Sequence, residues 1–152
     1  MSVAERLTEL GLELPEVAAP VAAYVPAVIS GNHVYVSGQL PFVDGALAAT
    51  GYLGDEVTVE QGYELSRIAV LNGLAAVASV IGSLDRVTRI VKLGGFVASA
   101  SGFTQQPAVI NGASELLGEI FGDIGKHARA AVGVAELPLG TPVELELIVE
   151  FT

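Results

Sequence analysis

The sequence predicts an α+β fold in which two helices lie on one face of a mixed β-sheet. Two segments with helical periodicity, 58–82 and 107–122, alternate with segments rich in β-branched residues. Predicted strands come both before the first helix and after the second, so distant parts of the chain must assemble the sheet. The 152 residues have the length of one domain with a substantial hydrophobic core, which we place at 1–152.

The first helix is predicted from its cap and its apolar stripe. Thr58 and Gln61 have the spacing of a capping box, and Gly82 is a typical stop signal. The second helix has Pro107 in its first turn and ends at Gly122. Apolar residues recur at intervals of three and four in both segments: Val70, Leu74, Val77 and Ile81, then Val109, Ala113, Leu116 and Ile120.

The remaining patterns predict strands, turns and one short helix. A short helix is expected over 3–10, a turn at Gly31-Asn32 and a glycine-rich loop over 45–54. Segments of alternating or β-branched residues predict the strands, which are 21–29, 33–37, 87–98, 129–135 and 143–151.

The composition excludes several classes of function. Seven Lys and Arg residues against 17 Asp and Glu residues give a net charge of −10, which opposes binding to nucleic acid. The absence of cysteine excludes a disulfide framework, a zinc–thiolate site and a cysteine nucleophile. The longest apolar-rich stretch, 68–81, is shorter than the roughly 20 residues of a membrane span, and the N-terminus lacks the pattern of a signal peptide. We therefore expect a cytoplasmic protein with no membrane partner.

The low charge content predicts an oligomer. Charged residues make up 16% of the chain, well below the roughly 25% of typical soluble domains. The sheet face without helices is therefore expected to pack against other copies of the chain. Clefts between subunits are common ligand sites.

Arg129 and Glu144 are the first candidates for a functional site. Arg129 begins a strand of small apolar residues. Its guanidinium there is either a bidentate hydrogen-bond donor for the carboxylate of a ligand or the partner of a surface acid. Glu144, Glu146 and Glu150 share one face of the last strand, as they also would on a solvated face. If other subunits cover that face, a carboxylate there has a raised pKa or a cationic partner. Arg129 is a candidate partner, because a short turn joins the two strands and allows them to pair.

The other polar candidates carry weaker signals. His33 and His127 are far apart in the sequence, so we expect no metal site. His127 precedes Arg129 by two residues and either lines the same pocket or lies in a polar loop. Ser37-Gly38-Gln39 supplies a hydroxyl and backbone amides, but the sequence contains neither a phosphate-binding glycine motif nor GxSxG.

Three ordered motifs carry a family resemblance over about 21–151. They are Tyr24 with Gly31-Asn32 and Ser37-Gly38-Gln39-Leu40-Pro41, then Val109-Ile110-Asn111 with Phe121, then Ala128-Arg129-Ala130-Ala131-Val132 with Leu137-Pro138 and Val143-Glu144. In order and spacing they resemble the RidA/YjgF family of imine deaminases, formerly described as L-PSP endoribonucleases. Three positions depart from the usual family pattern: His127 replaces Pro or Ala, Ala131 replaces a cysteine found in many members, and Leu145 replaces Ile or Met. Residues 1–20 are an extension relative to the compact members.

The resemblance implies a chorismate-mutase-like fold and a homotrimer, with a central barrel of three sheets and clefts between the subunits. It implies hydrolysis of reactive 2-imino acids, or their enamine tautomers, to 2-oxo acids and ammonia, without cofactor or metal. By the same resemblance, Arg129 anchors the substrate carboxylate and Glu144 positions water. The implied substrate-binding residues also include Tyr24, contributed by a neighbouring subunit, and Ser37, Gly38, Asn111 and Ala131.

Two alternative functions stay open at the level of sequence. The altered pocket residues His127, Ala131 and Leu145 allow a trimer that binds small carboxylates without fast catalysis. The older family name points to ribonuclease activity, which the net charge of −10 opposes.

Overall fold

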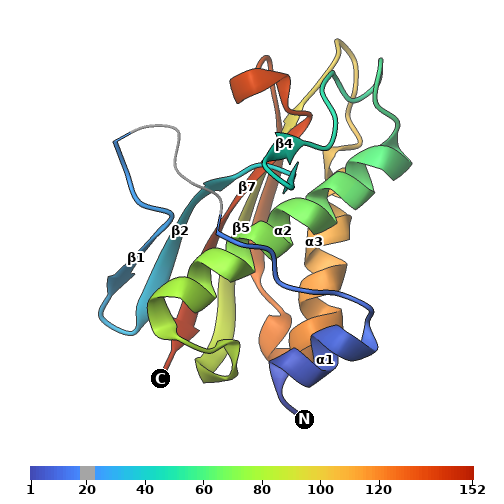
Figure 1. The fold of residues 1–152 in the computed structure, drawn as a ribbon. Coiled ribbons are helices and arrows are strands. Elements are labelled where there is room, and N and C mark those ends of the chain that lie inside the picture. Colours follow the sequence, from blue (N-terminus) through green and yellow to red (C-terminus); the bar gives the residue numbers. More distant parts are fainter. Residues whose placement is uncertain (18–22) are drawn as a thin grey trace.

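The structure is a computed structural model that describes residues 1–17 and 23–152. Within these residues the main sheet has five strands in the order β1-β2-β7-β5-β6, so strands from both ends of the sequence meet in its centre (Figure 1). All neighbouring strands are antiparallel except β5 and β6, which run parallel. The strands are β1 (Ala27–Ser30), β2 (His33–Gln39), β5 (Val87–Ala98), β6 (Ala128–Val134) and β7 (Val143–Phe151).

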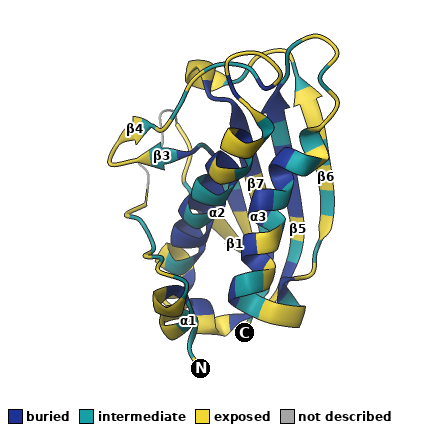
Figure 2. Cartoon of the chain, turned by 90° about the vertical axis from the view of Figure 1, so that its right-hand side faces the viewer, coloured by how far each residue is buried: buried dark blue, intermediate teal, exposed yellow. Residues whose placement is uncertain are grey.

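Two long helices cover one face of this sheet, as the sequence predicts. The capping box of Thr58 and Gln61 is present at the start of α2 (Val59–Ile81), and Gly82 caps its end. Pro107 lies in the first turn of α3 (Gln106–Phe121), which ends at Gly122. Figure 2 shows buried residues where the helices meet β5 and β7, and a more exposed β6 at the sheet edge. The α+β fold class is therefore confirmed.

Helix α2 is the central core element. By length and composition it is apolar enough to cross a membrane, but 61% of its apolar 18-residue window is buried inside the protein. Leu74, Ala76 and Val77 are fully buried, and they pack in one core with sheet residues that include Leu93 and Leu147. This burial is typical of a core helix.

A short helix, α1 (Val3–Glu9), packs on its own chain at the end of α3. Its Leu7 is buried in the main core. Arg6 Nε donates a hydrogen bond of 2.7 Å to the backbone oxygen of Glu119, and the backbone N–H of Val3 donates to Asp85 Oδ1 at 2.7 Å. The predicted N-terminal helix is thus confirmed, and it is tied to the helical layer.

None of the helices in residues 1–17 and 23–152 covers the opposite face of the sheet. The strand register places Val28, Tyr35, Phe96, Val132 and Ile148 on this face, and we call these five residues the open-face patch. Val28, Tyr35 and Val132 are each about half exposed, at 51%, 48% and 45%. The exposed apolar side chains agree with an oligomer interface, which stays a prediction.

Two sequence expectations about the strands were wrong. The strand expected over 21–29 begins only at Ala27; residues 21 and 22 lie outside the described residues, and 23–26 are not in a strand. The last two strands, connected through η3 (Pro138–Gly140), do not pair with each other: β6 pairs with β5, and β7 lies between β5 and β2.

The expected loop over 45–54 also contains β4 (Ala46–Leu47), which pairs with β3 (Phe42–Val43). The strand expected over 33–37 extends to Gln39, and the one expected over 129–135 lies at Ala128–Val134.

Gly112 sets the distance between α2 and α3. A Cβ atom on Gly112 would overlap both the backbone oxygen of Tyr63 and Ser66 Oγ. Ser66 Oγ also accepts the backbone N–H of Ala113 at 3.0 Å and donates to Val109 O at 2.9 Å. The helices are therefore in backbone contact at this point, with no space for a methyl group.

We predict that Gly112→Ala lowers the free energy of unfolding by about 3 kcal/mol, because the helices must separate. The matched control is Gly118→Ala in the same helix, where a Cβ meets no atom within 4 Å. That control should stabilise the protein by about 1 kcal/mol through helix propensity. Urea unfolding at fixed protein concentration measures both values. Equal effects for the two variants would contradict the close packing at Gly112.

Candidate functional site

Arg129 lies on the edge strand β6, on the face of the sheet that the helices cover. Its register partner is Leu93 of β5, a fully buried core residue. Arg129 Nη1 donates hydrogen bonds to Asn111 Oδ1 at 2.8 Å and to Ser114 Oγ at 3.2 Å. Nε and Nη2 make no hydrogen bond to any described residue, and none of the ion pairs found there includes Arg129. Nη1 of the guanidinium is thus held, while its Nε–Nη2 edge has no partner among the described residues.

The partners of Arg129 come from one side of α3. Asn111 and Ser114 are three residues apart, which places them on the same face of the helix. The sequence singled out Asn111 but missed Ser114, although this spacing was a usable signal. Ala131, two residues after Arg129, lies on the same face of β6 and is partly buried against the core. His127 lies in the loop before β6, as one of its two alternatives expected, and its Nε2 lies 2.9 Å from Ser114 Oγ, so it contacts Arg129 through Ser114.

Glu144 lies on the open face of the sheet, in the central strand β7. It is directly opposite Phe96 of β5, and the register of β2 and β7 is interrupted between Val36 and Gln39. A Cβ atom on Gly38 would overlap Glu144 Oε1, so glycine leaves space for the carboxylate over this irregularity. Burial, and then the charge of Glu146, raise the pKa of the half-buried Glu144 carboxyl.

Hydrogen bonds connect Ser37, which precedes Gly38, to the segment that carries Tyr24. Ser37 Oγ donates to Val25 O at 2.6 Å, and Ser37 N donates to Pro26 O at 2.9 Å. These bonds fix the segment that carries Tyr24, whose side chain is 46% exposed. On the helix side, Asn72 Nδ2 donates to Leu40 O and Phe42 O at 3.1 Å each, which secures the chain after Gly38. The sequence had given Asn72 no such role.

The predicted site residues therefore form two separate groups within one chain. Asn111, Arg129 and Ala131 lie at the β6 edge on the helix side, while Tyr24, Ser37, Gly38 and Glu144 lie around the open face. Pairing of Arg129 with Glu144 through adjacent strands was a wrong expectation, because β5 separates the two strands.

The separation of the two groups is too large for one small ligand. The register partners of Arg129 and Glu144 in β5 are Leu93 and Phe96, so the two residues are offset by three positions along the sheet. This offset corresponds to about 10 Å along the strands. Because the residues also lie two strands apart, they are separated by about 10 Å across the sheet, and their side chains point to opposite faces. Leu145 is also excluded from the open-face group, since it is fully buried on the helix side.

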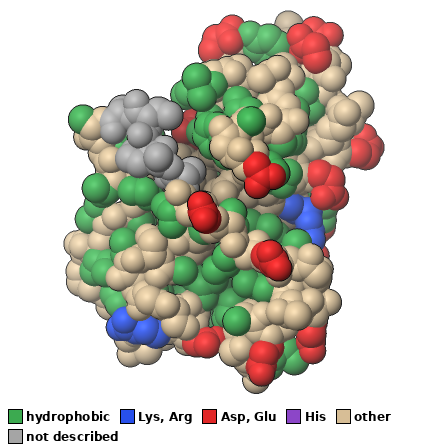
Figure 3. All heavy atoms as spheres, in the orientation of Figure 1, with side chains coloured by type: hydrophobic (Ala, Val, Ile, Leu, Met, Phe, Trp, Pro, Cys, Tyr) green, Lys and Arg blue, Asp and Glu red, His purple; other side chains and the backbone are tan. Residues whose placement is uncertain are grey.

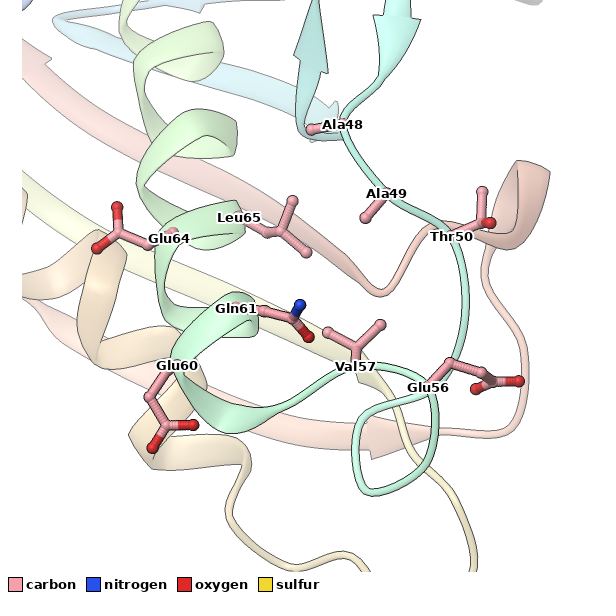
Figure 4. Close-up of a pocket in the computed structure, with 9 residues that line it drawn as sticks. All are labelled: Ala48, Ala49, Thr50, Glu56, Val57, Glu60, Gln61, Glu64 and Leu65. Atoms are coloured by element: carbon pink, nitrogen blue, oxygen red, sulfur yellow. The ribbon is translucent and has the colours of Figure 1, made fainter.

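Other concavities among the described residues lie away from both groups. A cavity of about 490 Å³ lies between α2 and the loop after β4, with Val57 and Leu65 inside it and Glu56, Glu60 and Glu64 at its rim (Figure 4). A smaller one of about 170 Å³ lies on the open face beside Tyr35, Lys92 and Glu146. Neither is lined by a predicted site residue. Within residues 1–17 and 23–152, no cluster of three or more His, Asp or Glu side chains is placed to hold a metal ion.

The raised pKa of Glu144 predicts a pH-dependent stability change in Glu144→Gln. A carboxyl whose pKa is raised in the folded state contributes stability below its unfolded value, and this contribution is lost as the pH rises through the folded value. At pH 7 the charged Glu144 therefore destabilises the fold, and Glu144→Gln should have a higher Tm than the wild type. The difference should shrink below about pH 4. The control is Glu13→Gln at an exposed position; a lower Tm for Glu144→Gln at pH 7 would contradict the prediction.

Comparisons with known proteins agree with the fold and the motifs. The family described as "YjgF/chorismate mutase-like, putative endoribonuclease" matches residues 4–151. Protein TCP17 of Trypanosoma cruzi is 47% identical over 149 residues, covering 97% of this chain and 93% of that protein. A 2-iminobutanoate/2-iminopropanoate deaminase of Dermatophagoides farinae is 32% identical over 131 residues, covering 86% of this chain and 87% of that protein.

A solved structure extends the agreement to nearly the whole fold. The crystal structure of Atu1372 from Agrobacterium tumefaciens, a protein described as having unknown function, is 46% identical. It superimposes with a TM-score of 0.93 over 99% of this chain and 92% of that one. Sequence motifs, fold and relatives lead to the same conclusion: the chain belongs to the RidA/YjgF family.

Proposed function

We propose that this protein hydrolyses reactive 2-imino acids and their enamine tautomers to 2-oxo acids and ammonia. The observation that carries the proposal is the guanidinium of Arg129, whose Nη1 is held by Asn111 and Ser114 while Nε and Nη2 have no partner among the described residues. The Nε and Nη2 donors form a planar fork that matches the two oxygens of a carboxylate. A 2-imino acid supplies that carboxylate next to its reactive carbon.

Glu144 is the proposed general base and acid. Burial and the neighbouring Glu146 raise the pKa of its carboxyl, so its carboxylate accepts a proton more readily than an ordinary glutamate does. In the proposed reaction, Glu144 takes a proton from water as the oxygen adds to the imine carbon. Glu144 passes that proton to the imine nitrogen, which gives a carbinolamine. It then moves the hydroxyl proton of the carbinolamine to the amino nitrogen. The carbon–nitrogen bond breaks as the carbon–oxygen double bond forms, and ammonia leaves with the 2-oxo acid as the second product. The main contribution of the protein is positioning of the reactants.

The proposed site is completed between two copies of the chain. Arg129 and Glu144 of one chain point to opposite faces of the sheet, so one substrate needs Arg129 of one subunit and Glu144 of the next. The open-face patch is the apolar surface that a neighbouring copy would cover. In the homotrimer that we propose, Tyr24, Ser37 and Gly38 accompany Glu144, and Asn111 and Ala131 accompany Arg129.

The relatives and the charge favour this chemistry over ribonuclease activity. A relative with 32% identity carries the name of an imine deaminase. The net charge is −10, and acidic side chains outnumber basic ones on the helix face in Figure 3. Affinity for RNA depends on clustered positive charge. The proposed partner is a small carboxylate rather than a nucleic acid.

We predict that Arg129→Ala lowers kcat/KM for freshly generated 2-iminobutanoate by about 100-fold, because the carboxylate loses its bidentate partner. Arg129→Lys should be intermediate, since it keeps the charge but not the fork. Ammonia release measures the rate. Wild-type activity in Arg129→Ala would refute the proposed anchor. If the wild type binds the 2-oxo acid but does not accelerate hydrolysis, the protein is a carboxylate-binding relative without fast catalysis.

Mixed oligomers test the location of the site. Arg129→Ala and Glu144→Gln should each be inactive alone, but each mixed trimer should contain one restored site out of three. Each restored site combines Arg129 from one variant with Glu144 from the other. Coexpression with two different affinity tags isolates the mixed species for the ammonia assay. Absence of any restoration would show that each site is formed within one chain.

A further inference from the structure

Behind Arg129, four groups form a continuous hydrogen-bonded chain. Arg129 Nη1 lies 3.2 Å from Ser114 Oγ, Ser114 Oγ lies 2.9 Å from His127 Nε2, and His127 Nδ1 lies 2.6 Å from Gly125 O. Both ring nitrogens of His127 are therefore engaged by atoms of the same chain. Within the chain, the imidazole is connected to Arg129 through Ser114.

The chemistry of these groups fixes the direction of each hydrogen bond. A backbone oxygen only accepts, so His127 Nδ1 carries a hydrogen and donates it to Gly125 O. In the neutral imidazole, Nε2 is then the acceptor, and the Ser114 hydroxyl donates to it. Ser114 Oγ keeps its lone pairs for Arg129 Nη1, which can only donate. Along this series of hydrogen bonds from Arg129 to Gly125, each donated hydrogen thus has one acceptor.

The Gly125 carbonyl is fixed by close packing. Gly125 is buried, and a Cβ atom there would lie 2.5 Å from the backbone oxygen of Leu117 in α3. The residue therefore lies directly against the helix that also carries Asn111 and Ser114. This contact fixes the acceptor that sets the tautomer of His127.

We propose that His127 is a positioning residue, which acts through Ser114 to orient Arg129 for the carboxylate of the substrate. With His127 as its acceptor, the Ser114 hydroxyl presents lone pairs to Nη1 and holds the guanidinium with its Nε–Nη2 edge towards the ligand. Without that acceptor, the hydroxyl hydrogen can rotate towards Nη1, where two donors repel each other. The inference rests on the proposed function only in that Arg129 binds a carboxylate.

The tautomer of His127 gives a test without ligand or activity. Free neutral imidazole favours the form with hydrogen on Nε2, whereas the structure requires hydrogen on Nδ1. Long-range proton–nitrogen NMR at about pH 8.5, where histidine is generally neutral, distinguishes the two forms. The chain has two histidines, so a His33→Gln variant assigns the signals. An Nε2-protonated His127 would overturn the proposal.

Binding of 2-oxobutanoate, measured by calorimetry, tests the coupling to Arg129. His127→Leu should weaken binding about fivefold, the loss of one ordered hydrogen bond, and His127→Gln should restore it by supplying an acceptor oxygen. Ser114→Ala should weaken binding to the same degree, and the double variant Ser114→Ala/His127→Leu no further, because His127 acts only through Ser114. With the imine substrate, His127→Leu should raise KM and leave kcat unchanged. Lys126→Gln is the control, since Lys126 is exposed and pairs with Asp123 at 2.9 Å.

The binding outcomes separate the two proposals. Loss of binding in Arg129→Ala together with wild-type binding in His127→Leu would overturn the role of His127 and leave the anchor intact. Equal binding by the wild type and Arg129→Ala would overturn both. Binding that follows the expected order without accelerated imine hydrolysis would support the positioning role and refute the proposed catalysis.

Discussion

Neighbouring side chains of a strand point to opposite faces of a sheet, and in this chain that alternation separates Glu144 from Arg129. Arg129 shares its face with the buried core residue Leu93, whereas Glu144 shares its face with Phe96 of the open-face patch. A shift of one residue in either register would exchange the two faces and expose core residues such as Leu145. The hydrophobic core therefore fixes the position of both polar groups, and with it the need for a second copy of the chain in the proposed site.

Glycine allows the close approaches that the two groups require. Gly38 leaves the space that the Glu144 carboxylate occupies, and Gly125 lies against the backbone of α3. Gly112 brings α3 close to α2, and α3 in turn carries Asn111 and Ser114. Gly112 and Gly125 thus make backbone contacts that would exclude any larger residue, whereas a Cβ at Gly38 would displace the Glu144 carboxylate.

The two groups differ in how strongly their polar atoms are held. Arg129 and its neighbours form an ordered network, in which Nη1 has two partners and both nitrogens of His127 are engaged. Glu144 instead is half-buried beside another acid, a setting that raises its pKa. A rigid cation suits recognition of a fixed charge, and a carboxyl with a raised pKa suits proton transfer. This division of properties agrees with the roles that we propose for them.

The sequence alone determined the helices and most strands, because their signals are local. The capping box at Thr58, the stop at Gly82 and the alternation along 143–151 all act within a few residues. The ordered motifs around Tyr24, Asn111 and Arg129 were likewise sufficient to identify the family. Only the tertiary structure decided that β6 pairs in parallel with β5, and that Ser114 joins His127 to Arg129. Strand partners and side-chain networks are set by packing between distant segments, for which a local pattern carries no signal.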